Sequence, residues 1–226
     1  MIRWIAIAAL GGLVAALVVP SRDVPARPRL SPKLGRALLN NLTARAGLDD
    51  NWRLFFEALA KSESRWNPHA SNDSSGEVAA ALIAYTRNRK RYAGCGWPVS
   101  RYIHPGSGGF LGIIPANGLA VFWGTVLQCV DPHIVLEPAA NVVMAMGYAR
   151  RLMRWKQFKA NPTWHNLWRG WDNPAAMGPG ARRQKFERIL GELGHPSSFA
   201  DRQVTSLGSF DALAMLVHLR RGAVVA

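Results

Sequence analysis

The stretch 54–68 constrains the fold of this chain more than any other, because its apolar residues repeat with helical spacing. Asp49 and Asp50 precede it, and Asp side chains cap helix N-termini and interact favourably with the helix dipole there. Phe55 and Leu59 are four residues apart, so they lie on one face of the predicted helix. The sequence therefore predicts a helix with an apolar face that other segments must cover.

Glu63 stands at the end of this predicted helix, four residues after Leu59. That spacing predicts a carboxylate at the inner edge of the apolar face. Pro68 disfavours the helical conformation at Asn67, so we expect the helix to end near Trp66. A carboxylate in the last turn, beside apolar groups, meets an unfavourable dipole and loses water, and both effects raise its pKa. A general acid that works near neutral pH needs such tuning.

The residues around Glu63 resemble the catalytic helix of the soluble-type lytic transglycosylases, a family of the lysozyme-like superfamily. The resemblance is carried by residues 60–71, AKSESRWNPHAS. In that family a Glu-Ser pair ends the helix, an Asn-Pro turn follows, and a Ser comes shortly after. Residues 109–116, GFLGIIPA, are similar to the second motif of the family, an apolar strip that starts with Gly and ends with Pro. Together with a weaker third motif, the resemblance spans roughly residues 48–180.

Two positions depart from the pattern of this family. Gly112 stands where the second motif usually has Gln. The third motif lies in residues 169–174, RGWDNP, and there Trp171 replaces the expected Tyr. An indole can donate one hydrogen bond but cannot present a hydroxyl. These departures leave open a divergent enzyme or an inactive wall-binding assembly protein.

The resemblance implies an all-α, lysozyme-like domain of the goose-type and transglycosylase arrangement, acting on peptidoglycan. The bond cleaved would be the β-1,4 bond between N-acetylmuramic acid and N-acetylglucosamine. Glu63 would protonate the glycosidic oxygen and then accept the proton of the muramoyl 6-hydroxyl, which yields a 1,6-anhydro product. Ser64 and Ser71 would orient Glu63 or the sugar, and the backbone around Phe110 and Ile114 would line the cleft. No metal or cofactor is implied.

Aromatic residues are the other candidates for glycan contacts, since sugar rings dock on aromatic faces. The chain has nine Trp residues, most of which we expect in the core. We favour Trp97, in an inserted segment, and Trp171 for the cleft, with Asp172 beside it in the third motif.

A muramidase-type hydrolase, such as a phage endolysin or virion lysozyme, is the alternative enzyme. Ordinary glycosidases need two carboxylates that flank the scissile bond. Asp73 and Glu77 are the acids closest in sequence after Glu63, and their Ser- and Asn-rich surroundings indicate solvated loop acids. The sequence thus favours the transglycosylase route, which needs one carboxylate.

The charge of the chain predicts an anionic partner. Lys and Arg number 28 against 14 Asp and Glu, a formal charge of +14. Nucleic acid, anionic lipid and the acidic wall polymer all fit that charge, and an Arg-rich host proteome would explain it without a partner. The basic residues are scattered outside residues 87–91, which suits wall binding better than a nucleic-acid footprint, so we expect no nucleic-acid partner.

Residues 1–20 read as a signal peptide or a signal anchor. Arg3 is followed by an uncharged apolar run, residues 4–19, that is short for a bilayer span, and no clean cleavage site follows. Both outcomes export the chain. We expect a periplasmic protein held at the inner membrane by this segment, or a virion-associated one if a phage encodes it. A phage, secretion or conjugation assembly is a possible partner besides the glycan strands.

Cys95 and Cys129 are the only cysteines, too few for a tetrahedral zinc site. In an exported protein they predict a disulfide, with two buried free thiols as the alternative. The bond would join an inserted segment, residues 76–108, to the segment that follows it. That insert would lie near the cleft as a lid or extra wall.

The remaining pattern organises the chain into a linker, residues 21–30, a catalytic domain, residues 31–194, and a C-terminal linker and amphipathic helix, residues 195–226. An apolar stripe is expected along the first helix of the domain, and no strand pair is expected. The stripe comprises Leu34, Ala37, Leu38 and Leu42. Val126 and Trp155 are expected in the core. Further helices are expected at residues 31–45, 78–92, 115–129, 138–158, 164–171, 180–193 and 210–221. Ser31 is the expected N-cap of the first of these, and the helix at 138–158 is expected to be buried and central.

Overall fold

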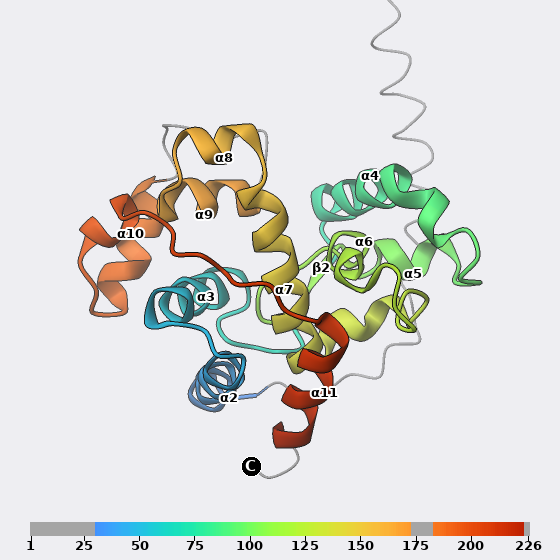
Figure 1. Cartoon of the computed structure of the whole chain (residues 1–226), viewed down its shortest axis with the longest axis horizontal. Coiled ribbons are helices and arrows are strands. Elements are labelled where there is room, and N and C mark those ends of the chain that lie inside the picture. The colour runs from blue at the N-terminus through green and yellow to red at the C-terminus, as the bar shows by residue number, and fades with distance from the viewer. Residues whose placement is uncertain (1–29, 173–182, 224–226) are drawn as a thin grey trace, which may run out of the picture.

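The structure is a computed structural model that describes residues 30–172 and 183–223. It is mostly helical, which confirms the all-α class (Figure 1). The α-helices are α2 (Pro32–Arg45), α3 (Asp50–Glu63), α4 (Ser75–Tyr92), α5 (Val99–Ile103), α6 (Pro115–Gly118), α7 (Pro138–Met153), α8 (Lys156–Ala160), α9 (Trp164–Asp172), α10 (Arg183–Glu192) and α11 (Ala212–Ala223). Three 3-10 turns accompany them: η1 (Leu119–Phe122), η2 (Pro132–Leu136) and η4 (Ser197–Asp201).

Helix α7 lies at the centre of the molecule, as the sequence predicts. Pro138 occupies its first turn, where the missing N–H costs nothing, and the residues 139–146 are all buried. Figure 1 shows α2 and α3 on one side of it and α4, α5 and α6 on the other. The helix ends at Met153, short of the expected residue 158, because the chain turns before α8 begins. Trp155, expected in the core, caps α8 and is exposed.

Helices α2 and α3 pack together in front of α7. Asp49 caps α3 as predicted, since its Oδ1 accepts a hydrogen bond from the Trp52 amide at 2.9 Å. The buried stripe of α2 comprises Gly35, Leu39, Leu42 and Thr43. The predicted stripe is wrong at Leu34 and Ala37, which are exposed. A Cβ at Gly35 would lie 1.8 Å from the Trp66 carbonyl oxygen, so the glycine lets α2 touch the turn after α3.

Aromatic rings join α3 to the later helices. Phe55 and Leu59 are buried, as predicted, and residues 54–60 are in fact buried on all sides. The Phe55 ring lies 5.2 Å from Trp164 and 6.3 Å from Phe186, centroid to centroid. Trp164 also stacks on Phe199 of η4. The expected C-terminal linker therefore contributes to this aromatic core.

The segment 115–129 does not form the single helix that the sequence predicts. Helix α6 ends at Gly118, η1 continues to Phe122, and turns follow. Gly124 adopts φ +79°, a left-handed conformation that ends any helix. Leu119 and Phe122 are buried as expected, whereas Val126, expected in the core, is 87% exposed.

A short strand pair joins the turn after α3 to the end of the insert. β1 (Ser71–Asn72) pairs antiparallel with β2 (Ser107–Gly108), and Ser71 is opposite Gly108. The expectation of no strand pair is wrong, because two residues are too few to produce a period-two pattern. The insert also contains α5, which was not among the expected helices. The pairing returns the chain to α3, so the second motif lies beside the end of that helix.

Helix α11 packs against α7 and α2. Arg220 forms an ion pair with Glu137, at the start of α7, and Arg45 of α2 donates to the His218 carbonyl oxygen at 2.7 Å. Among the described helices, none is both long and apolar enough to cross a membrane. The predicted anchor, residues 1–20, and the linker up to residue 29 lie outside the described residues.

Candidate functional site

The end of α3 positions Glu63. The helix stops at this residue, three positions before the expected end, and Arg65 and Trp66 adopt left-handed conformations with φ 51° and 60°. The amides of Ser64 and Trp66 both donate to the Ala60 carbonyl oxygen, at 3.1 Å each. The Ser64 hydroxyl donates to the same oxygen at 3.0 Å and is buried. Ser64 thus supports the helix end, and its role in orienting Glu63 or the sugar stays a prediction.

Glu63 lies in a pocket of about 500 Å³, here called the Glu63 pocket. Its lining residues come from α3, α4, β2, the second motif, α6, α7, α9 and α10. They are Glu63, Glu77, Ala80, Ser107, Gly112, Ile113, Ile114, Asn117, Tyr148, Trp171 and Lys185. Glu63 is exposed, so the expectation of a carboxylate buried at the inner edge of the apolar face is wrong. Because the helix ends at this residue, the side chain extends past the last turn into the pocket.

Gly112 lies directly against the Glu63 carboxylate. It has φ +59°, and a Cβ built on it would lie 3.0 Å from Glu63 Oε2 and 3.2 Å from Glu63 Cβ. Any side chain at this position would displace the carboxylate. The Gly in place of the Gln of the resembled family therefore has a steric reason, because the backbone of the second motif approaches Glu63 too closely for a side chain.

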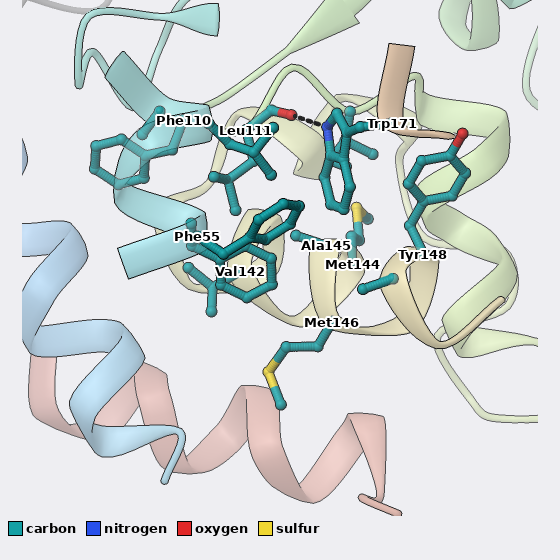
Figure 2. Close-up of a cluster of buried hydrophobic side chains, with 14 of the residues drawn as sticks. Phe55, Phe110, Leu111, Val142, Met144, Ala145, Met146, Tyr148 and Trp171 are labelled. Atoms are coloured by element: carbon teal, nitrogen blue, oxygen red, sulfur yellow. Dashed lines mark hydrogen bonds between the residues drawn. The ribbon is translucent and has the colours of Figure 1, made fainter. Parts of the chain in front are cut away.

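Trp171 is buried in the wall of the pocket, with 6% of its surface exposed. Its indole nitrogen donates to the Leu111 carbonyl oxygen at 2.9 Å (Figure 2). The only donor of this ring is therefore used to hold the second motif. Trp171 lines the pocket as expected, but it presents little surface for a sugar ring to dock on.

Tyr148 of α7 is a pocket residue that sequence reasoning missed. Its ring lies 5.1 Å from Trp171 in an edge-to-face arrangement, and Figure 2 shows the two side by side above α7. The apolar stripe of α7 indicated core alone. The phenol was the available signal, since a buried Tyr normally directs its polar tip to a partner or to water.

Asn141 is a second residue that the sequence reasoning missed. It is fully buried in α7, accepts from the Leu111 amide at 3.0 Å, and donates to the carbonyl oxygens of Gly108 and Val135 at 3.0 and 2.9 Å. These bonds attach the second motif to α7. A lone Asn in an apolar helix was the signal, because a buried amide must find partners.

Glu77 brings a second carboxylate to the Glu63 pocket. It lies in the first turn of α4, half-buried, and the backbone at Gly106 packs against it. The prediction of a solvated loop acid is wrong for Glu77. Asp73 is the exposed acid, and its Oδ1 accepts from the Gly106 amide and lies near His104 Nδ1, both at 3.3 Å. Asp73 is not among the residues that line the pocket.

The other predicted glycan contacts divide between the pocket and the core. Ile114 lines the pocket, whereas Phe110 is fully buried beneath it. Ser71 is exposed on β1, and Trp97 donates to the Cys129 carbonyl oxygen at 2.9 Å, and neither lines the pocket. Asp172 ends α9, and its side chain lies outside the described part of the chain.

Cys95 and Cys129 form the predicted disulfide, with their Cα atoms 4.8 Å apart. The bond ties the turn after α4 to the turns after η1. It therefore fastens the C-terminal end of α4, the helix whose first turn carries Glu77, to the segment that follows η1.

Two further pockets adjoin the Glu63 pocket. A pocket of about 520 Å³ shares Asn117 and Tyr148 with it, and another of about 380 Å³ shares Lys185. Arginines line both extensions. The Glu63 pocket and these two adjoining pockets are together called the groove. Within residues 30–172 and 183–223, no His, Cys, Asp or Glu cluster could hold a metal ion.

Comparisons with known proteins assign the chain to no family. No protein-family model matches it, and neither a curated protein nor a solved structure does. Its function is therefore argued from the groove and from the residues that line it.

Proposed function

We propose that the protein cleaves the glycan strands of peptidoglycan, as a divergent lytic transglycosylase of lysozyme-like fold, with Glu63 as general acid and base. The observation that carries this proposal is the position of Glu63. It ends α3, opens into a long groove and lies against the backbone of the second motif at Gly112. The apolar segment at residues 1–20 would export this groove to the wall.

The proposed reaction needs one carboxylate. Protonated Glu63 donates to the glycosidic oxygen, and the bond from that oxygen to C1 of the muramoyl residue breaks. The Glu63 carboxylate then accepts the proton of the 6-hydroxyl, whose oxygen bonds to C1 and closes the 1,6-anhydro ring. The attack is intramolecular and gains the corresponding proximity advantage. The protein would hold the strand so that the 6-hydroxyl oxygen lies next to C1.

A muramidase-type hydrolase is the second candidate, and Glu77 favours it. An inverting hydrolase needs a base about 6.5–9.5 Å from the acid, and a retaining one needs a nucleophile about 5–5.5 Å away. Glu77 shares the pocket with Glu63 and could activate water or attack C1. The sequence favoured the transglycosylase because no second carboxylate was expected near Glu63. The chemical ends produced on peptidoglycan therefore have to distinguish the two reactions.

Mass spectrometry of digested peptidoglycan tests the proposal. We expect 1,6-anhydromuramoyl ends, lighter by one water than reducing ends and inert to borohydride. Reducing ends alone would establish the hydrolase. Binding to the wall without cleavage would establish the inactive assembly protein, for which Gly112 and the hydrogen bond of Trp171 to Leu111 are the supporting observations.

A further inference from the structure

Four arginines converge on the pocket that adjoins the Glu63 pocket at Asn117 and Tyr148. Three of them come from the end of α7, and the fourth comes from the end of α4. They are Arg91, Arg150, Arg151 and Arg154, and with Trp123 and Phe210 they define what is here called the arginine pocket. Its volume is about 520 Å³.

Aromatic rings orient three of these guanidinium groups. The Arg91 guanidinium carbon lies 3.5 Å from the centroid of Trp123, and that of Arg151 lies 4.9 Å from the centroid of Tyr148. Arg150 lies 5.6 Å from the Phe210 ring. A guanidinium that stacks on a ring keeps its in-plane N–H donors for a ligand. Arg151 uses one of them, at 2.9 Å, to hold the Oδ1 atom of Asn117.

The positive charge of the arginine pocket is not balanced within the described chain. None of its four arginines forms an ion pair with an acid in residues 30–172 or 183–223. Asp211 is the one acid among the lining residues, and its Oδ1 caps α11 by accepting from the amides of Leu213 and Ala214 at 2.8 and 3.0 Å. The dipoles of α4 and α7 each favour basic residues at their own C-terminal ends, and the fold brings these two ends to one pocket.

We propose that the arginine pocket binds the carboxylates of the peptide arms that a peptidoglycan strand carries, while the sugars of that strand occupy the Glu63 pocket. This proposal rests on the proposed function. Arginine forks bind carboxylates in a bidentate manner, and charge-assisted hydrogen bonds are the stronger ones. Because the two pockets share Asn117 and Tyr148, one branched strand can fill both. The enzyme would then select strands that still bear peptides.

Cleavage of native and peptide-stripped strands by the full chain tests this selection. We expect the wild-type protein to prefer peptide-bearing strands by at least about tenfold, the size expected for one charge-assisted hydrogen bond. The Arg150→Gln, Arg154→Gln double variant should bring this preference close to one. The matched control is Arg87→Gln, Arg89→Gln, which removes two exposed arginines of α4 that line no described pocket and should keep the preference.

A binding measurement on protein that cannot cleave tests the arginine pocket independently of the cleavage mechanism. Calorimetry on Glu63→Gln protein should detect a muramyl tripeptide with free carboxylates, and the added double variant should weaken its binding at least about tenfold. Circular dichroism checks the folding of each variant, and Arg154→Gln alone replaces the double variant if the latter unfolds.

Equal cleavage of native and peptide-stripped strands would overturn the proposal for the arginine pocket and leave the proposed function standing. Tighter binding of pyrophosphate or of an oligonucleotide would assign the pocket to phosphate. Cleavage of neither strand would overturn the proposed function.

Discussion

At the residue scale, the site depends on the meeting of Glu63 with Gly112. The sequence indicated Glu63 through its helical spacing from Leu59 and through the Asn-Pro turn. It did not indicate that the carboxylate extends into solvent, nor that a glycine backbone closes on it, since the approach joins positions far apart in the chain. The proposed chemistry therefore has to be tested at both residues.

Replacement of Glu63 by Gln keeps the shape of the side chain and removes the transferable proton. We expect wall-clearing activity to fall at least about 100-fold, because positioned acid–base catalysis contributes about 10²–10⁴-fold. Turbidity of purified cell walls measures it. Glu77→Gln is the informative companion, since a transglycosylase should lose less than about tenfold, whereas a hydrolase should lose about as much as Glu63→Gln.

Replacement of Gly112 by Ala should disturb catalysis beyond its effect on stability. The left-handed backbone costs roughly 1–2 kcal/mol with a Cβ present, and that Cβ would lie 3.0 Å from Glu63 Oε2. We expect kcat to fall by up to about 100-fold as the carboxylate shifts. Gly124→Ala is the control, because Gly124 also has positive φ but has nothing within 4 Å of the added Cβ. Equal losses of activity in the two variants would contradict the role of Gly112.

At the element scale, the second motif is held by α7 and by the strand pair. Helices with long periodic patterns and clear start signals, such as α2, α3 and α7, could be predicted. The strand pair, α5 and the break after α6 could not be predicted. Segments of two to five residues show no readable periodicity, and tertiary contacts decide their conformation. Asn141 of α7 connects these elements, since its side chain hydrogen-bonds both Gly108 of β2 and Leu111 of the second motif.

Replacement of Asn141 by Ala should destabilise the fold strongly. It leaves the buried Leu111 amide and the Val135 carbonyl oxygen without a partner, at roughly 1–3 kcal/mol for each unsatisfied group, while the Gly108 carbonyl oxygen keeps its bond from the Ile113 amide. Urea unfolding measures the loss, which should exceed that of Asn88→Ala, at a half-buried position of α4 with one local bond, where about 0.5 kcal/mol is expected. A loss as small as that of Asn88→Ala would show that the second motif does not depend on α7.

At the scale of the whole molecule, the groove connects helices from the first to the last third of the chain. Arginines line both of its extensions, in keeping with the formal charge of +14. The insert forms one wall, and the disulfide attaches that wall to the turns after η1. The disulfide is thus a covalent link between two segments of the domain whose cysteines are 34 residues apart.

Loss of the disulfide should lower the stability of the whole domain. The two cysteines are 34 residues apart, and closing a loop of that length contributes roughly 3–4 kcal/mol by chain entropy. We expect Cys95→Ser, Cys129→Ser protein to unfold at correspondingly lower urea, and a reductant to shift wild type to the same midpoint. No effect of the reductant, together with two alkylatable thiols in native protein, would contradict the bond.

The sequence by itself determined the helical class, the caps of α2 and α3, the central position of α7, the pairing of the cysteines and the candidacy of Glu63. Each of these follows from the spacing of nearby residues, from the residues that begin and end helices, or from the number of cysteines. Tertiary structure alone decided that Gly112 lies against Glu63, that Glu77 rather than Asp73 shares the pocket, and that Arg91 joins the arginines of α7. Such contacts join distant parts of the chain, so they depend on how α4, α7 and the second motif pack, and no local pattern records that packing.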